Sequence, residues 1–175
     1  QALSWMVTPA GRLASFGDSW PAPVRQDLTG ASRFRDPALR FLTSDGAIGD
    51  PPQSGVKLYK NAGYAFARIL DRDLGEAPDQ ASYLAQAGAF HSRVHKHADH
   101  LGFIWSEGTT DILVEPGRYG YLGRVAAGEP LHDKGHWYSD PKRVFVESTR
   151  AHNCVEVDGE SHQRKGAKPF GGAIR

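Results

Sequence analysis

The chain has 175 residues, with 21 basic and 20 acidic side chains and a formal net charge of +1. This length can bury one core, and the near-neutral charge excludes a strongly basic nucleic-acid binder, so we expect no nucleic acid among its partners. The single Cys154 excludes an intrachain disulfide framework and CxxC zinc modules. No apolar run approaches the roughly twenty residues that span a bilayer, so we expect a soluble chain with no membrane partner.

The N-terminal third is rich in turn-forming residues. Residues 1–16 hold a short apolar piece that could be the tail of a helix or one strand. Residues 17–56 are full of Pro, Gly, Asp and Ser and are typical of a loop or linker. Within them, residues 36–43 ("DPALRFLT") predict a short helix, with Asp36 as N-cap and a proline in the first helical position.

From residue 63 onward the apolar pattern changes to a period of two, which is typical of half-buried strands. The predicted strands are 63–70, 82–88, the two arms 101–106 and 110–115 of a hairpin that turns at 107–109, and finally 143–148 and 153–159. Short β segments at this spacing predict a mainly β protein with an antiparallel sandwich.

Half of the eight histidines, His91, His95, His97 and His100, fall within ten positions of the segment "FHSRVHKHADHLGF". If this segment is an extended strand, His95 and His97 point to the same face. Exposed polar residues on a strand edge are the simpler interpretation of such a pair. Cupins also combine an HxH pair with a carboxylate, but they need a Glu about four positions later, where this chain has "LG".

The predicted hairpin offers a more specific interpretation. Its return arm ends beside the start of its outgoing arm, which places Glu115 near His97. His152 comes immediately before another predicted strand and can supply a third ligand. Two imidazoles and one carboxylate suit Zn²⁺ and leave a fourth position open.

The segments "SRVHKHADHLGFIW…DILVEPGRYGY" and "VFVESTRAHNCVEVDG" resemble the C-terminal β domain of the heparinase II/III family, and the resemblance covers residues 60–160. The resemblance implies a helical (α/α) toroid followed by an antiparallel β-sandwich, in a lyase that cleaves uronic-acid polysaccharides by β-elimination. "FGDSWP" resembles the junction after the toroid. We therefore expect residues 1–56 to be the end of the toroid and a linker, and residues 57–175 to be a truncated sandwich domain.

The resemblance also implies roles for individual residues. It makes His97, Glu115 and His152 the ligands of a divalent metal, most simply Zn²⁺, and His95 the catalytic histidine that faces the cleft. Glu115 stands in "VEPG" where the family usually has an Asp, and Cys154 stands where the family commonly has Thr. We interpret Cys154 as a small buried strand residue without a catalytic role.

An anionic sugar chain would need basic and aromatic contacts. The candidates for substrate binding are Arg93, Lys96, Tyr119 and Arg150, with Arg118, Tyr121 and Tyr138 as further possibilities that are equally consistent with structural roles.

The expected partners are an acidic polysaccharide (heparan-, hyaluronate- or alginate-like) and an upstream toroid. The chain opens at Gln1 and stops just after a turn-like run, so we expect a fragment. The resemblance implies that the partner groups of catalysis come from the toroid, so we expect the fragment to be inactive alone. The family suggests a periplasmic or secreted bacterial protein. The alternative function is a non-catalytic, metal-stabilised β module that binds acidic polysaccharide.

Overall fold

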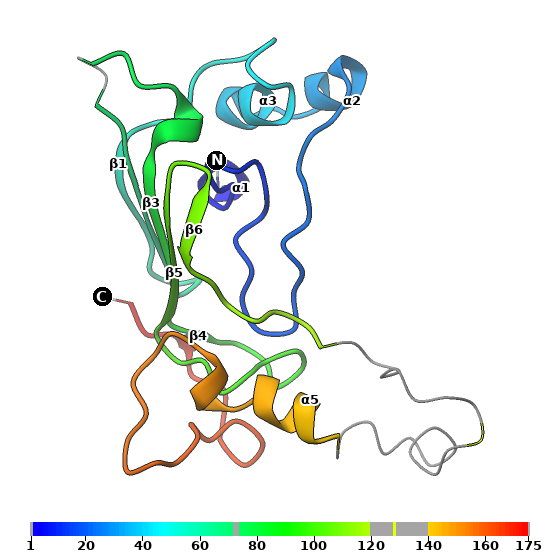
Figure 1. The fold of residues 1–175 in the computed structure, drawn as a ribbon, viewed down its shortest axis with the longest axis vertical. Helices are drawn as coiled ribbons and strands as arrows, with labels where there is room; N and C mark the ends of the chain where they lie inside the picture. Colours follow the sequence, from blue (N-terminus) through cyan, green and yellow to red (C-terminus); the bar gives the residue numbers. More distant parts are fainter. Residues whose placement is uncertain (1, 72–73, 120–127, 129–139, 175) are drawn as a thin grey trace.

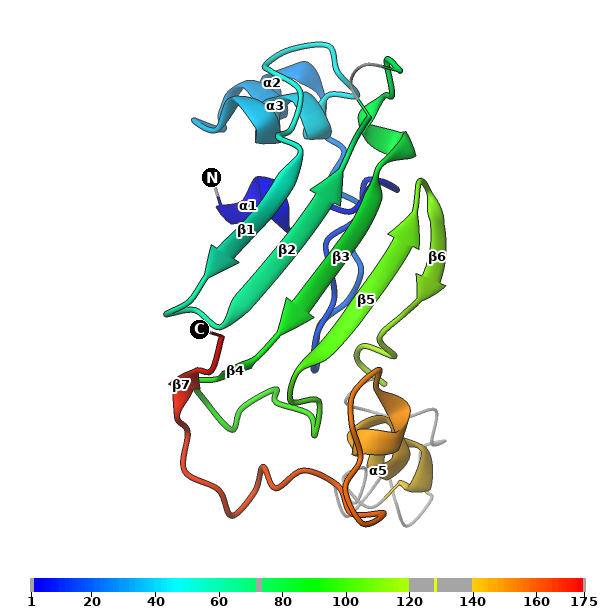
Figure 2. The same ribbon diagram turned by 90° about the vertical axis from the view of Figure 1, so that its left-hand side faces the viewer.

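A computed structural model describes residues 2–71, 74–119, 128 and 140–174. Its centre is a five-stranded antiparallel sheet in the order β1-β2-β3-β5-β6 (Figure 2). The strands are Gly55–Tyr59 (β1), Tyr64–Ile69 (β2), Ser82–Ala87 (β3), Gly102–Glu107 (β5) and Thr110–Leu113 (β6). The expected mainly β, antiparallel fold is therefore confirmed, and with it the strands near 63–70 and 82–88 and the hairpin that turns at 107–109.

Alternation along these strands buries one face of the sheet. Phe66 of β2 lies opposite Ala85 of β3, and both are buried in a cluster with Trp5, Ala14 and Tyr83. β1 was not expected, because it begins inside the Gly- and Pro-rich stretch that is typical of a loop. Between β2 and β3, the acidic turn region contains a short 3-10 helix, Pro78–Gln80.

The N-terminal segment lies against this buried face (Figure 1). It begins with the short helix α1 (Ala2–Trp5) and continues through an isolated bridge between Val7 and Leu13. The guanidinium of Arg68, which is only 2% exposed, donates to the carbonyl oxygens of Ser4 (3.0 Å) and Val7 (2.7 Å). Residues expected to be the end of a toroid and a linker thus share a core with the sheet, and the domain boundary itself stays a prediction.

Two short helices, α2 (Leu28–Ser32) and α3 (Pro37–Thr43), lie at one end of the sheet (Figure 1). The expected start of α3 is confirmed, because the Asp36 side chain accepts from the amide of Ala38 at 3.1 Å and Pro37 is the first helical residue. α2 was not expected from the sequence. Its cap is Asp27, whose side chain accepts from the amide of Gly30.

Both strands predicted after residue 140 are wrong. The first falls on a helix, α5 (Pro141–Val146), followed by the 3-10 turn Thr149–Ala151. Asp140 caps α5 by accepting from the amide of Lys142 at 2.8 Å, and an Arg143–Glu147 ion pair of 2.9 Å spans one turn. Capping and the i,i+4 pair outweigh the strand-like alternation here.

The second predicted strand, 153–159, is irregular apart from an isolated bridge between Val157 and Glu160. Beyond it, β7 (Gly171–Gly172) returns to pair with β4 (Ala89–Phe90) in a separate two-stranded sheet. Within the residues that the structure describes, no helix has both the length and the apolar composition needed to cross a bilayer.

Candidate metal and catalytic site

The histidine-rich segment between β4 and β5 is a loop and not an extended strand, so the condition under which His95 and His97 would share one face is not met. His95 has a left-handed backbone (φ 59°), which turns the chain between the two residues. As a result the side chain of His95 is 59% exposed, whereas that of His97 is 2% exposed. One imidazole therefore faces outward from this chain and the other faces its interior.

Glu115 lies just past the end of β6, at the base of the hairpin. Its carboxylate is buried and accepts from the amide of Asn153 at 3.2 Å. Gly102, at the start of β5, leaves the space that this carboxylate fills, since a Cβ there would lie 3.2 Å from Glu115 Oε1. The hairpin thus delivers Glu115 to the edge where β5 begins, as its geometry predicts.

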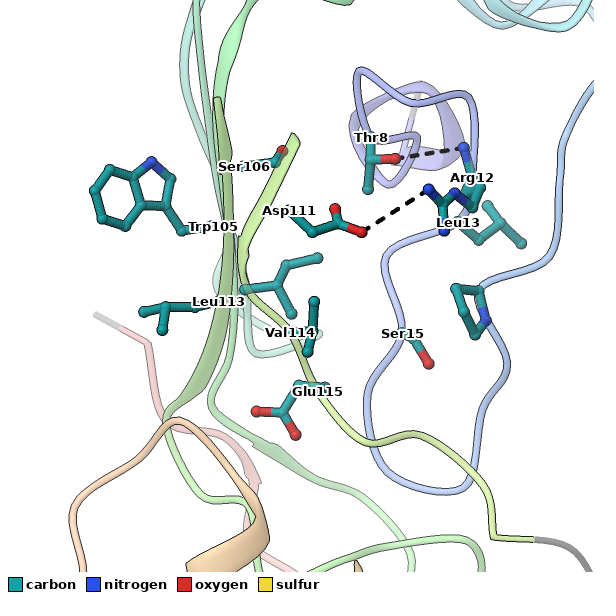
Figure 3. A pocket seen from close by; sticks show the side chains of 12 residues that line it. Thr8, Arg12, Leu13, Ser15, Trp105, Ser106, Asp111, Leu113, Val114 and Glu115 are labelled. Carbon is teal, nitrogen blue, oxygen red and sulfur yellow. Dashed lines mark hydrogen bonds and ion pairs between the residues drawn. The ribbon is translucent and has the colours of Figure 1, made fainter. Parts of the chain in front are cut away.

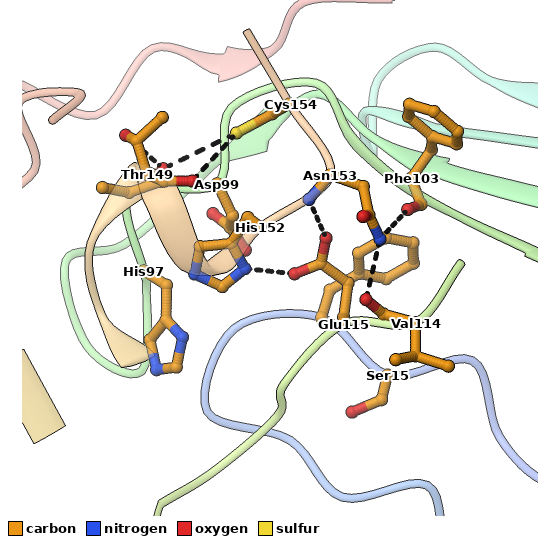
Figure 4. A network of polar contacts seen from close by, with 12 residues as sticks. Ser15, His97, Asp99, Phe103, Val114, Glu115, Thr149, His152, Asn153 and Cys154 are labelled. Atoms are coloured by element: carbon orange, nitrogen blue, oxygen red, sulfur yellow. Dashed lines mark hydrogen bonds and ion pairs between the residues drawn. The ribbon is translucent and has the colours of Figure 1, made fainter. Parts of the chain in front are cut away.

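His152 reaches the same point from the segment that follows α5. It ends the 3-10 turn Thr149–Ala151, and its Nδ1 contacts Glu115 Oε2. The next residue, Asn153, donates its side-chain amide to the carbonyl oxygens of Phe103 in β5 (3.1 Å) and of Val114 just after β6 (2.7 Å), so it fixes this segment to both sides of the hairpin (Figure 4). No strand is needed after His152 to hold its side chain at the site, because the hydrogen bonds of Asn153 attach this segment to the hairpin.

The structure brings these side chains into one buried cluster (Figure 4). Ligand atoms of Asp99, Glu115 and His152 lie within 4.8 Å of one another. The His97 ring lies beside this set, with its centroid 5.3 Å from that of His152. Asp99 was not identified from the sequence, although its position two residues after His97 could have indicated it. Its Oδ1 contacts the ammonium of Lys96.

The donor atoms of the cluster suit a divalent metal. Among the described residues, His97 Nδ1 and His152 Nε2 are buried ring nitrogens without a hydrogen-bond partner. Such atoms are costly unless something occupies them. Burial, followed by the nearby His152, lowers the pKa of His97 from 6.5 to about 4. The ring is therefore neutral at physiological pH and has a lone pair that can bind a metal.

His95 lies next to this cluster and is held from the N-terminal segment. Its Nδ1 is 3.0 Å from Asp18 Oδ2, and the other oxygen of Asp18 is 3.8 Å from His97 Nε2. Asp18 belongs to the "FGDSWP" stretch and was not singled out from the sequence. No local pattern could have indicated it, because it is 77 positions away from its partner.

The predicted substrate-binding residues are scattered. Arg93 donates to the carbonyl of Ala167 (2.8 Å), Arg150 pairs with Glu156 (3.1 Å), Tyr119 donates to Asp140 (3.4 Å), and Lys96 is turned inward to Asp99. Arg93 and Arg150 are on the surface. Their roles in substrate binding stay predictions, and Tyr121 and Tyr138 lie outside the described residues.

Two pockets flank the cluster. A pocket of about 190 Å³ lies between the N-terminal segment and the β5–β6 hairpin, with Glu115 at one end (Figure 3). A second, of about 630 Å³, is lined by residues that include His100, His152 and Asn153. The cluster is thus buried, but one of its residues, Glu115, lines the first pocket and another, His152, lines the second.

Cys154 is half-buried and lies in irregular chain, not in the strand expected for it. Its Sγ lies 3.8 Å from the Thr149 carbonyl oxygen and 4.0 Å from that of Ala98. Burial, with the Glu115 and Asp99 carboxylates, raises the pKa of the thiol to about 11. The thiol stays protonated at neutral pH, which makes it a poor nucleophile.

The fold and site define an antiparallel β domain built around a buried histidine–carboxylate cluster. The heparinase II/III-like C-terminal family matches residues 51–173, and the chain belongs to that family. A search of curated proteins finds no match.

Solved structures with a similar fold come from larger proteins. The heparan sulfate lyase HepC from Pedobacter heparinus aligns with a TM-score of 0.66 at 19% identity, over 91% of this chain and 23% of that one. A heparinase III gene product gives 0.65 at 15%, over 90% and 23%. A further heparinase III gives 0.63 at 14%, over 91% and 25%. The chain thus spans about a quarter of the length of these proteins.

Proposed function

We propose that this chain is the β-sandwich part of a polysaccharide lyase that cleaves uronic-acid-containing chains by β-elimination. The observation that carries the proposal is the exposed imidazole of His95 beside the buried His97, Glu115 and His152, in a chain of the heparinase II/III-like family. The outward ring offers a proton-transfer group to a substrate, and the inward residues offer a means of holding its loop.

The chemistry requires two proton transfers. A base removes the proton from the carbon next to the uronate carboxylate, the electron pair forms a carbon–carbon double bond, and the bond to the glycosidic oxygen breaks. An acid then protonates the departing oxygen. An imidazole ring can either accept or donate a proton, so His95 suits one of these transfers. An upstream helical domain supplies the other group, which makes that domain an obligatory partner and this chain inactive alone.

The metal in this proposal is Zn²⁺, held by His97, Glu115 and His152. The donor set, two neutral imidazoles and one carboxylate, and the two buried ring nitrogens support this assignment. When bound, the metal supplies a fixed point for the loop that carries His95. Asp99 is the competing ligand, because its carboxylate has a ligand atom within 4.8 Å of those of Glu115 and His152.

Heparan sulfate is the first substrate to test, since it is named for a protein of similar fold; hyaluronate and alginate follow. Arg93 and Arg150, which are on the surface, and Tyr119 are the proposed contacts to the anionic chain. Lys96 would join them only by leaving its pair with Asp99. Because such polymers are extracellular, we propose a periplasmic or secreted location, which fractionation of the native host would test.

The test is a 232 nm absorbance screen of the full-length protein against these polymers, because elimination leaves an unsaturated uronate. With an active substrate, His95→Ala should lower kcat by about 10²–10⁴-fold and keep its metal. His91→Ala is the matched control, since that exposed ring hydrogen-bonds to the loop carbonyl of Ala62, away from the cluster, and its loss should leave kcat unchanged.

A non-catalytic module is the second candidate, and the same experiment separates it from the lyase. The exposed arginines and the buried cluster are equally compatible with a metal-stabilised domain that only binds acidic polysaccharide. Retention on heparan sulfate without any absorbance change, from a preparation with bound metal, would favour the module. Full activity in His95→Ala would instead remove this histidine from the chemistry.

A further inference from the structure

The loop of residues 16–19 lies between the histidine-rich loop and the segment that follows Glu115, and it contacts both. The amide of Asp18 donates to the carbonyl oxygen of His95 at 3.0 Å, and the amide of Arg118 donates to the carbonyl oxygen of Ser19 at 2.9 Å. Gly17 approaches so closely that a Cβ would lie 2.6 Å from the His95 oxygen. The N-terminal segment therefore touches the site through backbone as well as side chain.

These contacts fall on a residue whose backbone needs support. His95 adopts a left-handed conformation (φ 59°), which is sterically unfavourable for residues with a Cβ. The hydrogen bond from Asp18 and the close packing of Gly17 both act on the His95 carbonyl group. The loop thus holds the peptide unit that aims the His95 side chain outward.

The Asp18 side chain then restrains the ring itself. Its Oδ2 lies 3.0 Å from His95 Nδ1, and the carboxylate is 5% exposed while the imidazole is 59% exposed. A carboxylate can only accept a hydrogen bond, so the hydrogen of a neutral ring must be on Nδ1. The lone pair is then on Nε2, the nitrogen on the far side of the ring from Asp18.

We propose that Asp18 is a positioning residue that fixes both the orientation and the tautomer of His95. The restraint comes from the N-terminal segment and acts directly on His95 through Asp18 Oδ2, while the other oxygen of Asp18 lies 3.8 Å from His97 Nε2. Its consequence for catalysis rests on the lyase function proposed above, whereas its effect on the tautomer does not. Two measurements therefore test the two parts independently.

The first measurement is the ¹⁵N spectrum of histidine-labelled full-length protein at a pH where the ring is neutral, with His95→Gln used to assign the signals. In the wild type His95 should carry its hydrogen on Nδ1. In Asp18→Ala it should move toward the Nε2–H form that an unrestrained imidazole favours. Asp45→Asn, which alters a surface pair with Arg25, should leave the spectrum of His95 unchanged. A His95 tautomer that is the same with and without the Asp18 carboxylate would overturn the proposal.

The second measurement is a double-mutant cycle on heparan sulfate cleavage. Asp18→Asn should lower kcat by about 10–100-fold, the usual effect of losing a group that orients a functional histidine, with KM little changed and metal content retained. In a His95→Gln background the same change should cost less than about twofold, because its target is gone. Equal losses in both backgrounds would show a general structural role and overturn the proposal.

The two arms separate the possible failures. If the wild-type protein cleaves no uronate polymer, the lyase function fails, and the tautomer measurement still decides whether Asp18 positions His95. If cleavage occurs and the cycle is additive, the lyase function stands and the positioning role fails.

Discussion

Acidification of the metal-free protein should destabilise it through His97. Its ring is 2% exposed, and burial together with His152 holds its folded-state pKa at about 4 instead of 6.5. Between these values the unfolded chain binds the proton and the folded chain does not, so the free energy of unfolding falls as the pH falls. The neutral ring's contribution is complete above about pH 6.5 and is lost progressively down to pH 4.

The magnitude follows from the two pKa values. They differ by about 2.5, and one pH unit corresponds to about 1.4 kcal/mol, so the full effect is on the order of 3 kcal/mol, of which about 2 kcal/mol is lost between pH 7 and pH 4.5. This is a large fraction of the stability of an ordinary domain.

Urea unfolding of chelator-treated protein, followed by circular dichroism at several pH values, measures the effect. His97→Gln removes the ionisable ring and keeps a polar side chain, so its stability should fall less steeply over the same range. His91→Gln is the control, because that ring is exposed, and it should follow the wild type. Wild-type and His97→Gln curves that run parallel from pH 7 to pH 4.5 would refute the argument.

Three further predictions concern the same region. His97→Ala should abolish stoichiometric metal in elemental analysis while Asp99→Asn retains it; the reverse result would make Asp99 the ligand. Gly17→Ala should destabilise the protein by more than about 2 kcal/mol in thermal or urea unfolding, because both a positive φ of 56° and a 2.6 Å contact oppose the new Cβ, whereas Gly11→Ala (φ 68°, open space) meets only the first penalty. Equal effects at the two glycines would contradict the close contact. In the folded protein, Cys154 should react with iodoacetamide at pH 8 about 100-fold more slowly than a free thiol. Peptide mass spectrometry measures this rate, which should return to that of a free thiol when the protein is unfolded. Fast labelling in the folded protein would contradict the raised pKa.

Local signals predicted the sheet well because its strands are half-buried. Phe66 and Arg68 alternate with outward-facing residues, and that alternation is visible in the sequence. The helix start at Asp36 was equally visible. The same Asp-Pro signal recurs at Asp140, where it correctly marks α5, but the β-branched residues of "RVFVES" favoured a strand. At that point capping chemistry was the better guide than apolar periodicity.

The positions of site residues could be predicted only where the geometry of the sheet determines them. The register of the hairpin predicts Glu115 near His97, and the structure places the Glu115 carboxylate against His152, whose ring lies beside that of His97. The directions of His95 and His97 could not be predicted, because a single left-handed residue reverses the alternation that a strand would give. The contact of Asp18 with His95 could not be predicted for another reason: the two residues are 77 positions apart, and no periodic pattern in the sequence relates them.

The pairing of β4 with β7 has a consequence for the order in which the protein folds. It joins Ala89–Phe90 to Gly171–Gly172 and so encloses the whole stretch 91–170, which contains the histidine loop, the β5–β6 hairpin and the His152 arm. Closing a longer loop costs more chain entropy, so we expect the hairpin to form before this two-residue pairing. A pairing so short can also open without melting the five-stranded sheet. The cluster thus lies in a loop whose ends are joined by a pairing of only two residues on each strand, and a bound metal would hold that loop together whenever the pairing opens.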